Sequence, residues 1–331
     1  MRNQSFEELP LFDKLLNKVL TYYSSIWQDR RQDGIHQEWL ENFKNSNDDI
    51  QESERLNALY LLSKFMYFGN LEVRVLLKSI FRDLFKYKIV SAVRKANRDT
   101  TDIRFLNDAF EREMQQTRFL GVGNPSESGV HLLYYFRQEN NLSKELFINT
   151  HEIFKIVELV ENQGESNERK VLNTELFNPS VRRYIFIDDF CGSGNQAKEY
   201  SKNLVNYIKK IDPTIEVNYL MLFGTESGLK TIKLETDFDN IESVFLIDDS
   251  FKCFSDDSRY FNAGYAEITK DLSKALCEKY GKILLPNFPL GYKDGQLLIS
   301  LFHNTPDNTL PIFWADAQNW KPIFKRYNKI Y

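Results

Sequence analysis

Two adjacent carboxylates followed by a glycine-rich turn form the stretch of this 331-residue chain that is richest in chemistry. The apolar run 184–187 precedes Asp188 and Asp189, and the turn 191–195 then leads into a segment of helical periodicity. In an open parallel sheet, ligands bind beyond the carboxyl ends of the strands. Backbone N–H groups in a glycine-rich turn at a helix start bind anions. The order strand, acids, turn, helix therefore predicts an anion site beside a carboxylate pair.

The ligand expected at such a site carries both hydroxyls and a phosphate. Two carboxylates repel a phosphate, but they accept hydrogen bonds from hydroxyls or bind a metal ion. Sugar hydroxyls and a phosphate on one ligand imply a ribose 5-phosphate. We expect Asp188 and Asp189 to be the catalytic carboxylates. The residues expected to bind the ribose phosphate are Cys191, Gly192, Ser193, Gly194, Asn195 and Gln196.

Two other phosphate-binding motifs do not fit this turn. A P-loop requires GxxxxGK[ST], which the chain lacks here, and in this stretch the glycines follow acids. A dinucleotide-binding GxGxxG would require a glycine where Ala197 stands, and its acid would follow the turn instead of preceding it. A turn that serves packing alone remains the alternative.

The elements that must position these residues divide the chain into two parts. Residues 1–120 contain only two of the 14 glycines and one of the nine prolines, and apolar positions such as those over 73–85 recur at helical spacing. We predict a helical N-terminal region over 1–116 that packs on the rest of the chain as a bundle, with a dedicated binding surface as the alternative. An α/β domain with a largely parallel sheet is predicted over 117–331.

Short apolar runs alternate with turn signals and helical stretches after residue 117, which is typical of an α/β fold. A helix is predicted over 197–210, directly after the turn. The polar and poorly periodic stretch 161–180 is predicted to be a long irregular excursion before the central strand. The predicted strands are 119–122, 184–187, 217–223, 244–247, 282–285 and 297–302.

A second strand–loop–helix pattern over 119–137 is a second candidate anion loop, because its glycines free the backbone and its serines stand at a helix start. Glu127 within it repels an anion unless Mg²⁺ bridges the two. A packing turn is the alternative. The residues proposed for this loop are Gly123, Asn124, Ser126, Ser128 and Gly129.

Three further positions could take part in the chemistry. Asp248 and Asp249 follow the predicted strand 244–247 and could orient a base, bind Mg²⁺ or simply be solvated at a strand end. His303 follows the last predicted strand and is a candidate general acid or base, although a single histidine is more often structural. The turn N–H groups could also lower the pKa of Cys191.

The stretch 184–196 resembles the signature with which phosphoribosyltransferases bind phosphoribosyl pyrophosphate (PRPP): four apolar residues, two acids, a few residues, then Thr/Ser-Gly-x-Thr. The resemblance implies that Asp188 and Asp189 face the ribose 2′- and 3′-hydroxyls and that Ser193 donates its hydroxyl to the 5′-phosphate. It also implies that the second loop takes the place of the pyrophosphate loop. Gln196 departs from the pattern, because the family has Thr there.

Three more segments, 117–129 with the helix that follows it, 289–292 and 303–314, resemble the phosphoribosyltransferase-like effectors of bacterial conflict systems. Some members of that family accompany retron reverse transcriptases. The resemblance implies a type I-like phosphoribosyltransferase fold, Mg²⁺ bound with PRPP or a nucleotide, and glycosyl transfer or glycosidic cleavage. It further implies a toxic antiphage role under a partner protein, such as a reverse transcriptase complex with its non-coding RNA and DNA.

The composition excludes several classes of protein. With 43 basic and 47 acidic residues the formal net charge is −4, which argues against broad nucleic-acid binding. The apolar runs are too short for a membrane helix, and three scattered cysteines form neither a disulfide framework nor a zinc site, so we expect a cytoplasmic protein. A catalytically inert module that senses a nucleotide or PRPP stays open as an alternative, as does a base-salvage enzyme.

Overall fold

The computed structural model describes residues 10–27, 34–123, 127–161, 169–262 and 264–327. The chain folds into two compact units. The first comprises Met1–Val73 with Ile247–Tyr331 and is called the split unit below, and the second, the sheet unit, comprises Arg74–Leu246. The boundary expected between residues 116 and 117 falls inside the sheet unit.

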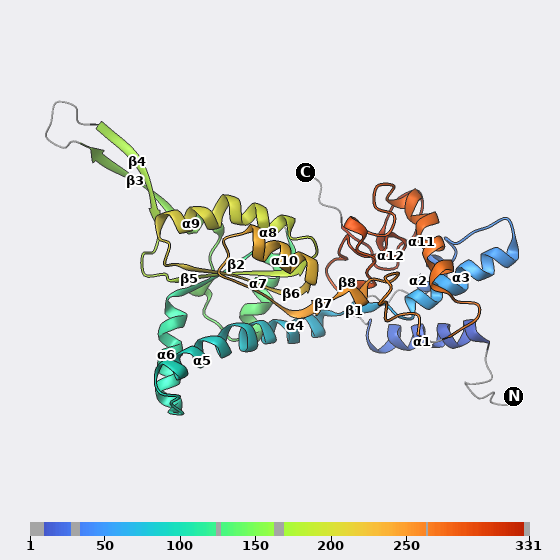
Figure 1. The fold of residues 1–331 in the computed structure, drawn as a ribbon, viewed down its shortest axis with the longest axis horizontal. Helices are drawn as coiled ribbons and strands as arrows, with labels where there is room; N and C mark the ends of the chain where they lie inside the picture. The colour runs from blue at the N-terminus through green and yellow to red at the C-terminus, as the bar shows by residue number, and fades with distance from the viewer. Residues whose placement is uncertain (1–9, 28–33, 124–126, 162–168, 263, 328–331) are drawn as a thin grey trace. The chain divides into compact units, whose positions relative to one another are not determined.

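The sheet unit is organised around a four-stranded sheet in the order β2, β5, β6, β7 (Figure 1). The strands are β2 (Thr117–Gly121), β5 (Arg183–Cys191), β6 (Glu216–Thr225) and β7 (Asn240–Ile247). β5 pairs in parallel with both β2 and β6, and Asp188 lies opposite Met221 in the register. Most residues of β5 and β6 are buried, because helices cover both faces of a parallel sheet. The predicted α/β fold with a largely parallel sheet is confirmed.

Helices cover both faces of this sheet. In Figure 1, α8 and α9 lie on one face, and α4 to α6 lie on the other. The predicted helix over 197–210 is confirmed as α8, a π-helical segment Ser201–Val205, and α9. The helices of the unit are α4 (Asn70–Ser79, which begins at the unit boundary), a π-helical segment Ile80–Lys86, α5 (Tyr87–Ala96), α6 (Ile103–Gln115), α7 (Ser128–Glu139), α8 (Asn195–Tyr200), α9 (Asn206–Ile211) and α10 (Glu226–Glu235).

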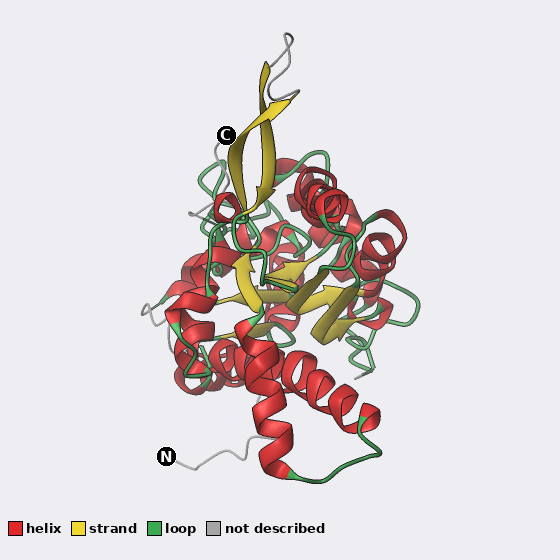
Figure 2. Ribbon diagram, turned by 90° about the vertical axis from the view of Figure 1, so that its left-hand side faces the viewer, coloured by secondary structure: helices red, strands yellow, loops and turns green. Residues whose placement is uncertain are grey.

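An antiparallel hairpin of β3 (Phe154–Glu161) and β4 (Arg169–Leu176) extends from the sheet unit (Figures 1 and 2). The prediction of an irregular excursion over 161–180 was wrong, because β4 lies within it. Cross-strand ion pairs join Lys155 to Glu175, at 3.5 Å, and Lys170 to Glu158, at 2.7 Å. Charged residues on a hairpin hide the alternation that marks a strand with one buried face.

The split unit joins the N-terminal helices to the C-terminal part of the chain in one aromatic core. Trp39 stacks on Phe313, with ring centroids 5.2 Å apart, and its indole N–H donates to the Ile312 carbonyl oxygen at 2.7 Å. Phe65 stacks on Phe324. The elements are α1 (Leu11–Ser25), α2 (Ile35–Leu40), α3 (Asp48–Leu62), β1 (Met66–Phe68), α11 (Lys270–Leu284), β8 (Ile299–Leu301) and α12 (Pro311–Trp314), with β1 and β8 paired in parallel.

Two strand predictions in this unit had opposite outcomes. The strand predicted over 297–302 is confirmed as β8. The strand predicted over 282–285 is wrong, because this run is the last turn of α11, whose buried residues Leu276, Tyr280 and Leu284 recur every four positions. A four-residue apolar run at the end of a helix has the same local pattern as a buried strand. Within the described residues, no helix is long and apolar enough to cross a membrane.

Two glycines set the distance between β2 and α7. A Cβ atom on Gly121 would lie 2.5 Å from the backbone of Val130, and one on Gly129 would lie 2.4 Å from the Val122 carbonyl oxygen. These separations are far below van der Waals contact. Gly121 and Gly129 therefore allow the start of α7 to pack directly against the end of β2.

We predict that Gly129→Ala lowers the free energy of unfolding by about 1–3 kcal/mol, the usual cost of overpacking a rigid contact. Urea denaturation measures the change. Gly224→Ala is the control, because its Cβ would meet only the Leu229 side chain, at 3.1 Å, which can shift. Equal losses in the two variants would contradict the close-approach argument.

Candidate functional site

The two acids lie near the carboxyl end of the central strand β5. Both are buried, with Asp188 4% exposed and Asp189 8% exposed. The Tyr219 hydroxyl of β6 donates to Asp188 Oδ2 at 2.5 Å, and the backbone N–H of Asp189 donates to Asp188 Oδ1 at 2.9 Å. The parallel pairing of β5 and β6 thus fixes the orientation of the first carboxyl group.

Burial raises the pKa of Asp188 well above its usual range, and the neighbouring charge of Asp189 raises it further. The hydrogen bond from Tyr219 acts in the opposite direction but is outweighed. Burial likewise raises the pKa of the Tyr219 hydroxyl. The ionised Asp188–Asp189 pair therefore gains stability from any ligand that supplies hydroxyl donors or positive charge.

The turn after the acids is held in shape from α10. The Thr225 hydroxyl donates to the Gly192 carbonyl oxygen at 2.5 Å, and a Cβ on Gly228 would lie 2.3 Å from that oxygen. Gly194 has a φ of 76°, a left-handed conformation that favours glycine, and it immediately precedes α8. Ser193 in this turn is half-buried. The structure thus places acids, glycine turn and helix start in the order that the sequence predicts.

Cys191 contributes backbone to the turn but no reactive thiolate. Burial raises the pKa of its thiol to about 12, and the charge of Asp188 adds to this rise. The backbone N–H of Gly194 acts in the other direction and is outweighed. The expectation that turn N–H groups lower this pKa was wrong, since a thiol that is 3% exposed is governed by desolvation.

The second loop is tied to the first by side-chain hydrogen bonds. The Gln196 amide donates to Glu127 Oε2 at 2.7 Å. The Tyr200 hydroxyl accepts from the Gly123 N–H at 2.7 Å and donates to the Gly123 carbonyl oxygen at 2.6 Å. The two residues that conflicted with a phosphoribosyltransferase site in the sequence, Gln196 and Glu127, are therefore direct partners.

The structure bears on only part of the second anion loop. Asn124 and Ser126 lie outside the described residues. Ser128 and Gly129 begin α7, and Glu127 occupies the position just before it. A carboxylate there interacts favourably with the positive end of the helix and offsets its attraction for a bound anion.

The remaining candidates, Asp248, Asp249 and His303, belong to the split unit, whereas Asp188 belongs to the sheet unit. Asp248 accepts hydrogen bonds from the backbone N–H and hydroxyl of Ser250, which lower its pKa. It also lies 3.5 Å from the Arg259 guanidinium, so it caps a turn at the end of β7. The His303 ring packs on Phe302, with centroids 4.9 Å apart.

The acid pair suits a magnesium ion only together with a ligand. Among the residues that the structure describes, no group of three or more His, Cys, Asp or Glu side chains converges as metal ligands. Mg²⁺ in proteins is commonly held by one or two carboxylates plus substrate phosphates and water. Asp188 and Asp189 fit that role if the bound ligand provides phosphate oxygens.

Sequence reasoning missed the residues that support the site from neighbouring elements. Tyr219 stands inside the apolar run 217–223, where its ring is buried and only its hydroxyl reveals a polar role. Thr225 and Gly228 act on the turn across the sheet, at a sequence distance of more than thirty residues. Only the strand order, which brings β6 beside β5, connects them to the acids.

A parallel sheet whose central strand ends in an acid pair and a glycine turn is the arrangement of a phosphoribosyltransferase-like protein. The chain belongs to the PRTase-CE family, whose model matches residues 36–326. PRTase abbreviates phosphoribosyltransferase, and the family match covers both units.

Solved structures show more distant similarity. The xanthine-guanine-hypoxanthine phosphoribosyltransferase of Helicobacter pylori is 12% identical over 44% of this chain and 86% of its own, with a TM-score of 0.22. A hypothetical protein from Neisseria gonorrhoeae with bound ppGpp is 10% identical over 56% of this chain and 85% of its own, with a TM-score of 0.29. The AQ2163 protein from Aquifex aeolicus is 10% identical over 71% of this chain and 84% of its own, with a TM-score of 0.29. None of the curated proteins matches the chain significantly.

We predict that Asp188→Asn stabilises the protein at pH 8, by on the order of 1 kcal/mol, the usual effect of relieving one unfavourable interaction. Since folding raises the pKa of Asp188, its favourable contribution to stability is complete below the ordinary aspartate pKa of 3.8 and is lost as the pH rises through the pKa of the folded protein. Asparagine does not ionise, so the variant and the wild type should melt together near pH 4 and diverge at higher pH.

Thermal unfolding from pH 4 to pH 8 measures this effect. Asp212→Asn is the control of opposite sign, because hydrogen bonds from Thr214 lower the pKa of Asp212. The control variant should be less stable than the wild type at pH 8. A melting temperature of Asp188→Asn that stays at or below the wild type at pH 8 would contradict the prediction.

Proposed function

We propose that this protein is a phosphoribosyltransferase-like toxic effector of a bacterial antiphage defence system. It acts on ribose-phosphate or nucleotide substrates by glycosyl transfer or glycosidic cleavage. The observation that carries the proposal is the buried Asp188–Asp189 pair at the end of β5, followed directly by a turn that Thr225 and Gly228 hold in place. Membership of the PRTase-CE family supports the same class of ligand.

The geometry suggests how the chain would act on the C1′ bond of a ribose. The carboxylates accept hydrogen bonds from the ribose hydroxyls and tolerate the positive charge of an oxocarbenium-like transition state. Turn N–H groups around Ser193 hold the 5′-phosphate. Because ligand hydroxyls favour the ionised form of Asp188, substrate binding completes the negative pair where positive charge develops. Bound Mg²⁺ would neutralise a departing pyrophosphate.

The defence role in this proposal includes control by a partner protein, such as a retron reverse transcriptase complex with its non-coding RNA and DNA. It rests on the resemblance of segments 117–129, 289–292 and 303–314 to conflict-system effectors. The helices within 1–116 are proposed as the assembly or regulatory part. A cytoplasmic location is supported by Cys191, Cys253 and Cys277, which are free and buried.

We predict that the double variant Asp188→Asn/Asp189→Asn abolishes both toxicity and nucleotide turnover in cells that express the protein with its activating partner. Growth curves and a profile of cellular nucleotides measure the two effects together. Asp256→Asn/Asp257→Asn is the matched control, since Asp256 is fully exposed in a surface turn and Asp257 is its neighbour. Unchanged toxicity and turnover in the site variant would overturn the proposed activity.

A second candidate function is an inert module that senses a nucleotide or PRPP in a defence complex. The hydrogen bond between Gln196 and Glu127 favours the sensor, because an amide stands where the family has Thr and a carboxylate lies in the loop proposed for pyrophosphate. Calorimetry with PRPP, combined with chromatography for products, separates the two functions. Binding without any product in the active complex supports the sensor, whereas consumption of PRPP or nucleotide supports the enzyme.

We predict that Glu127→Gln increases the affinity for inorganic pyrophosphate about tenfold, equivalent to about 1.4 kcal/mol, because it removes a negative charge from the second loop. Glu145→Gln, on an exposed part of the same unit, is the control of equal charge change. Calorimetric dissociation constants provide the comparison. Equal affinities in the two variants would place pyrophosphate away from the second loop.

A further inference from the structure

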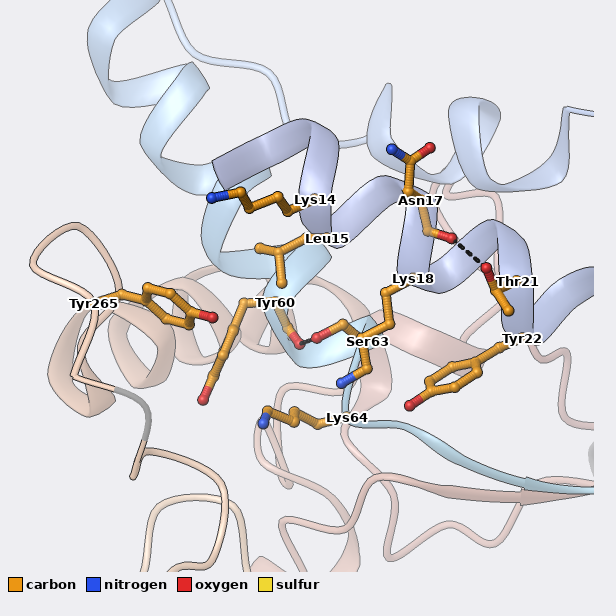
Figure 3. A pocket seen from close by; sticks show the side chains of 10 residues that line it. All are labelled: Lys14, Leu15, Asn17, Lys18, Thr21, Tyr22, Tyr60, Ser63, Lys64 and Tyr265. Carbon is orange, nitrogen blue, oxygen red and sulfur yellow. Dashed lines mark hydrogen bonds between the residues drawn. The ribbon is translucent and has the colours of Figure 1, made fainter. Parts of the chain in front are cut away.

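The split unit contains a cavity of about 370 Å³ that is far in sequence from the acid pair. One helix, α1, supplies six of the ten lining residues, and Tyr60 of α3, the two residues after α3 and Tyr265 supply the rest (Figure 3). Its volume is within the range of small-molecule sites in proteins. The lining residues are Lys14, Leu15, Asn17, Lys18, Thr21, Tyr22, Tyr60, Ser63, Lys64 and Tyr265.

The lining is positively charged and has no acidic residue. Lys18 and Lys64 make no ion pair with a carboxylate in the part of the chain that the structure describes, and each ammonium instead lies near an aromatic ring. Lys18 Nζ is 5.5 Å from the centroid of Tyr22, and Lys64 Nζ is 5.2 Å from that of Tyr60. In Figure 3 the two lysine side chains lie between these rings. Such a pair of half-buried cations is suited to an anion.

The two ammonium groups destabilise each other. Burial lowers the pKa of Lys18, and burial followed by the charge of Lys18 lowers the pKa of Lys64. A bound anion would relieve this repulsion and compensate for the lost hydration. The hydroxyls of Thr21 and Ser63 already donate to the Asn17 and Tyr60 carbonyl oxygens, at 2.8 and 2.7 Å, so they can still accept but are not spare donors. The lysines are therefore the main anion contacts.

A second cavity of about 410 Å³ adjoins the first and also has Lys18, Tyr22, Ser63 and Lys64 in its lining. It adds Trp27 and the segment 65–68 to the lining, where Trp27, Phe65 and Tyr67 are buried in the core and Phe68 is half-buried. The lysine pair therefore stands where two cavities meet, and aromatic rings line both of them. Aromatic side chains are the usual platforms for a nucleobase, and lysines neutralise its phosphates.

We propose that this cavity pair is a second ligand site, which binds a free nucleotide through its phosphates at Lys18 and Lys64. Its base would pack on one of the accessible rings, which are those of Tyr22, Phe68 and Tyr265. Each cavity has the size for one small molecule, not for a length of polynucleotide. The site lies in the split unit and is independent of Asp188 and Asp189, which are in the sheet unit. It gives the chain a nucleotide contact even if the acid pair has another ligand.

Lysine acetylation of the full chain, read by mass spectrometry, tests the proposal at the residues themselves. The probes are ADP, inorganic pyrophosphate, adenosine and a ten-nucleotide oligo(dT). We expect ADP to slow acetylation of Lys18 and Lys64 at least fivefold. Pyrophosphate has the phosphates without the base, and adenosine has the base without the phosphates. Each should therefore protect the two lysines far less than ADP does at the same concentration. Lys252 and Lys274, both half-buried in the same unit, should be unaffected.

Variants provide a second readout. Lys18→Gln/Lys64→Gln should weaken the binding of ADP to the split unit at least tenfold in calorimetry, while Lys252→Gln/Lys274→Gln, with the same charge change, should not. The labelling experiment on wild-type protein remains decisive if the first variant fails to fold. The proposal is overturned if ADP gives no protection, if pyrophosphate alone protects equally, or if only the oligonucleotide protects. Loss of activity at Asp188 would leave these outcomes unchanged, so the two sites are tested separately.

Discussion

The burial of one carboxyl group constrains the whole candidate site. Asp188 is enclosed between β5 and β6, with the Tyr219 hydroxyl on one oxygen and the Asp189 N–H on the other. Such a group does not stabilise the folded state, because an ionised carboxylate loses hydration on burial. The charge of the adjacent Asp189 disfavours its ionisation further. Buried acids with raised pKa values are concentrated at functional sites. The buried acid pair therefore supports the proposed ligand site.

The glycines around this pair have two separate physical roles. Gly123 and Gly194 adopt positive φ angles, with which their loops turn back toward Tyr200 and into α8. Gly121, Gly129 and Gly228 instead permit backbone to approach backbone within a distance that any side chain would prevent. Loop shape and helix packing thus depend on each other, because moving α7 or α10 away from the sheet would also displace the loops beside the acids.

How much the sequence predicts depends on the range of the interactions. The runs 184–187 and 217–223 predict strands because a parallel sheet buries both faces, and the acids and turn follow from local order. The run 282–285 has the apolar pattern of a buried strand but lies at the end of α11. A run of four residues is too short to distinguish helical from strand periodicity. The stacking of Trp39 on Phe313 joins the two ends of the chain, and no local pattern reveals it. For the same reason Tyr219 was not identified as a partner of Asp188.

The charges of the two loops bear on the choice between the two proposed reactions, glycosidic cleavage and glycosyl transfer. Glu127 accepts a hydrogen bond from Gln196, whose amide is uncharged. The second loop therefore keeps a carboxylate beside the positive end of α7, whereas the turn at 191–195 has none within it. In the proposed site, a ligand with a single phosphate next to its ribose would meet only the turn at 191–195. A ligand that also carries a pyrophosphate must meet Glu127 and needs a cation to bridge it. Within the proposed function, this charge pattern favours cleavage of a nucleoside monophosphate over transfer from PRPP.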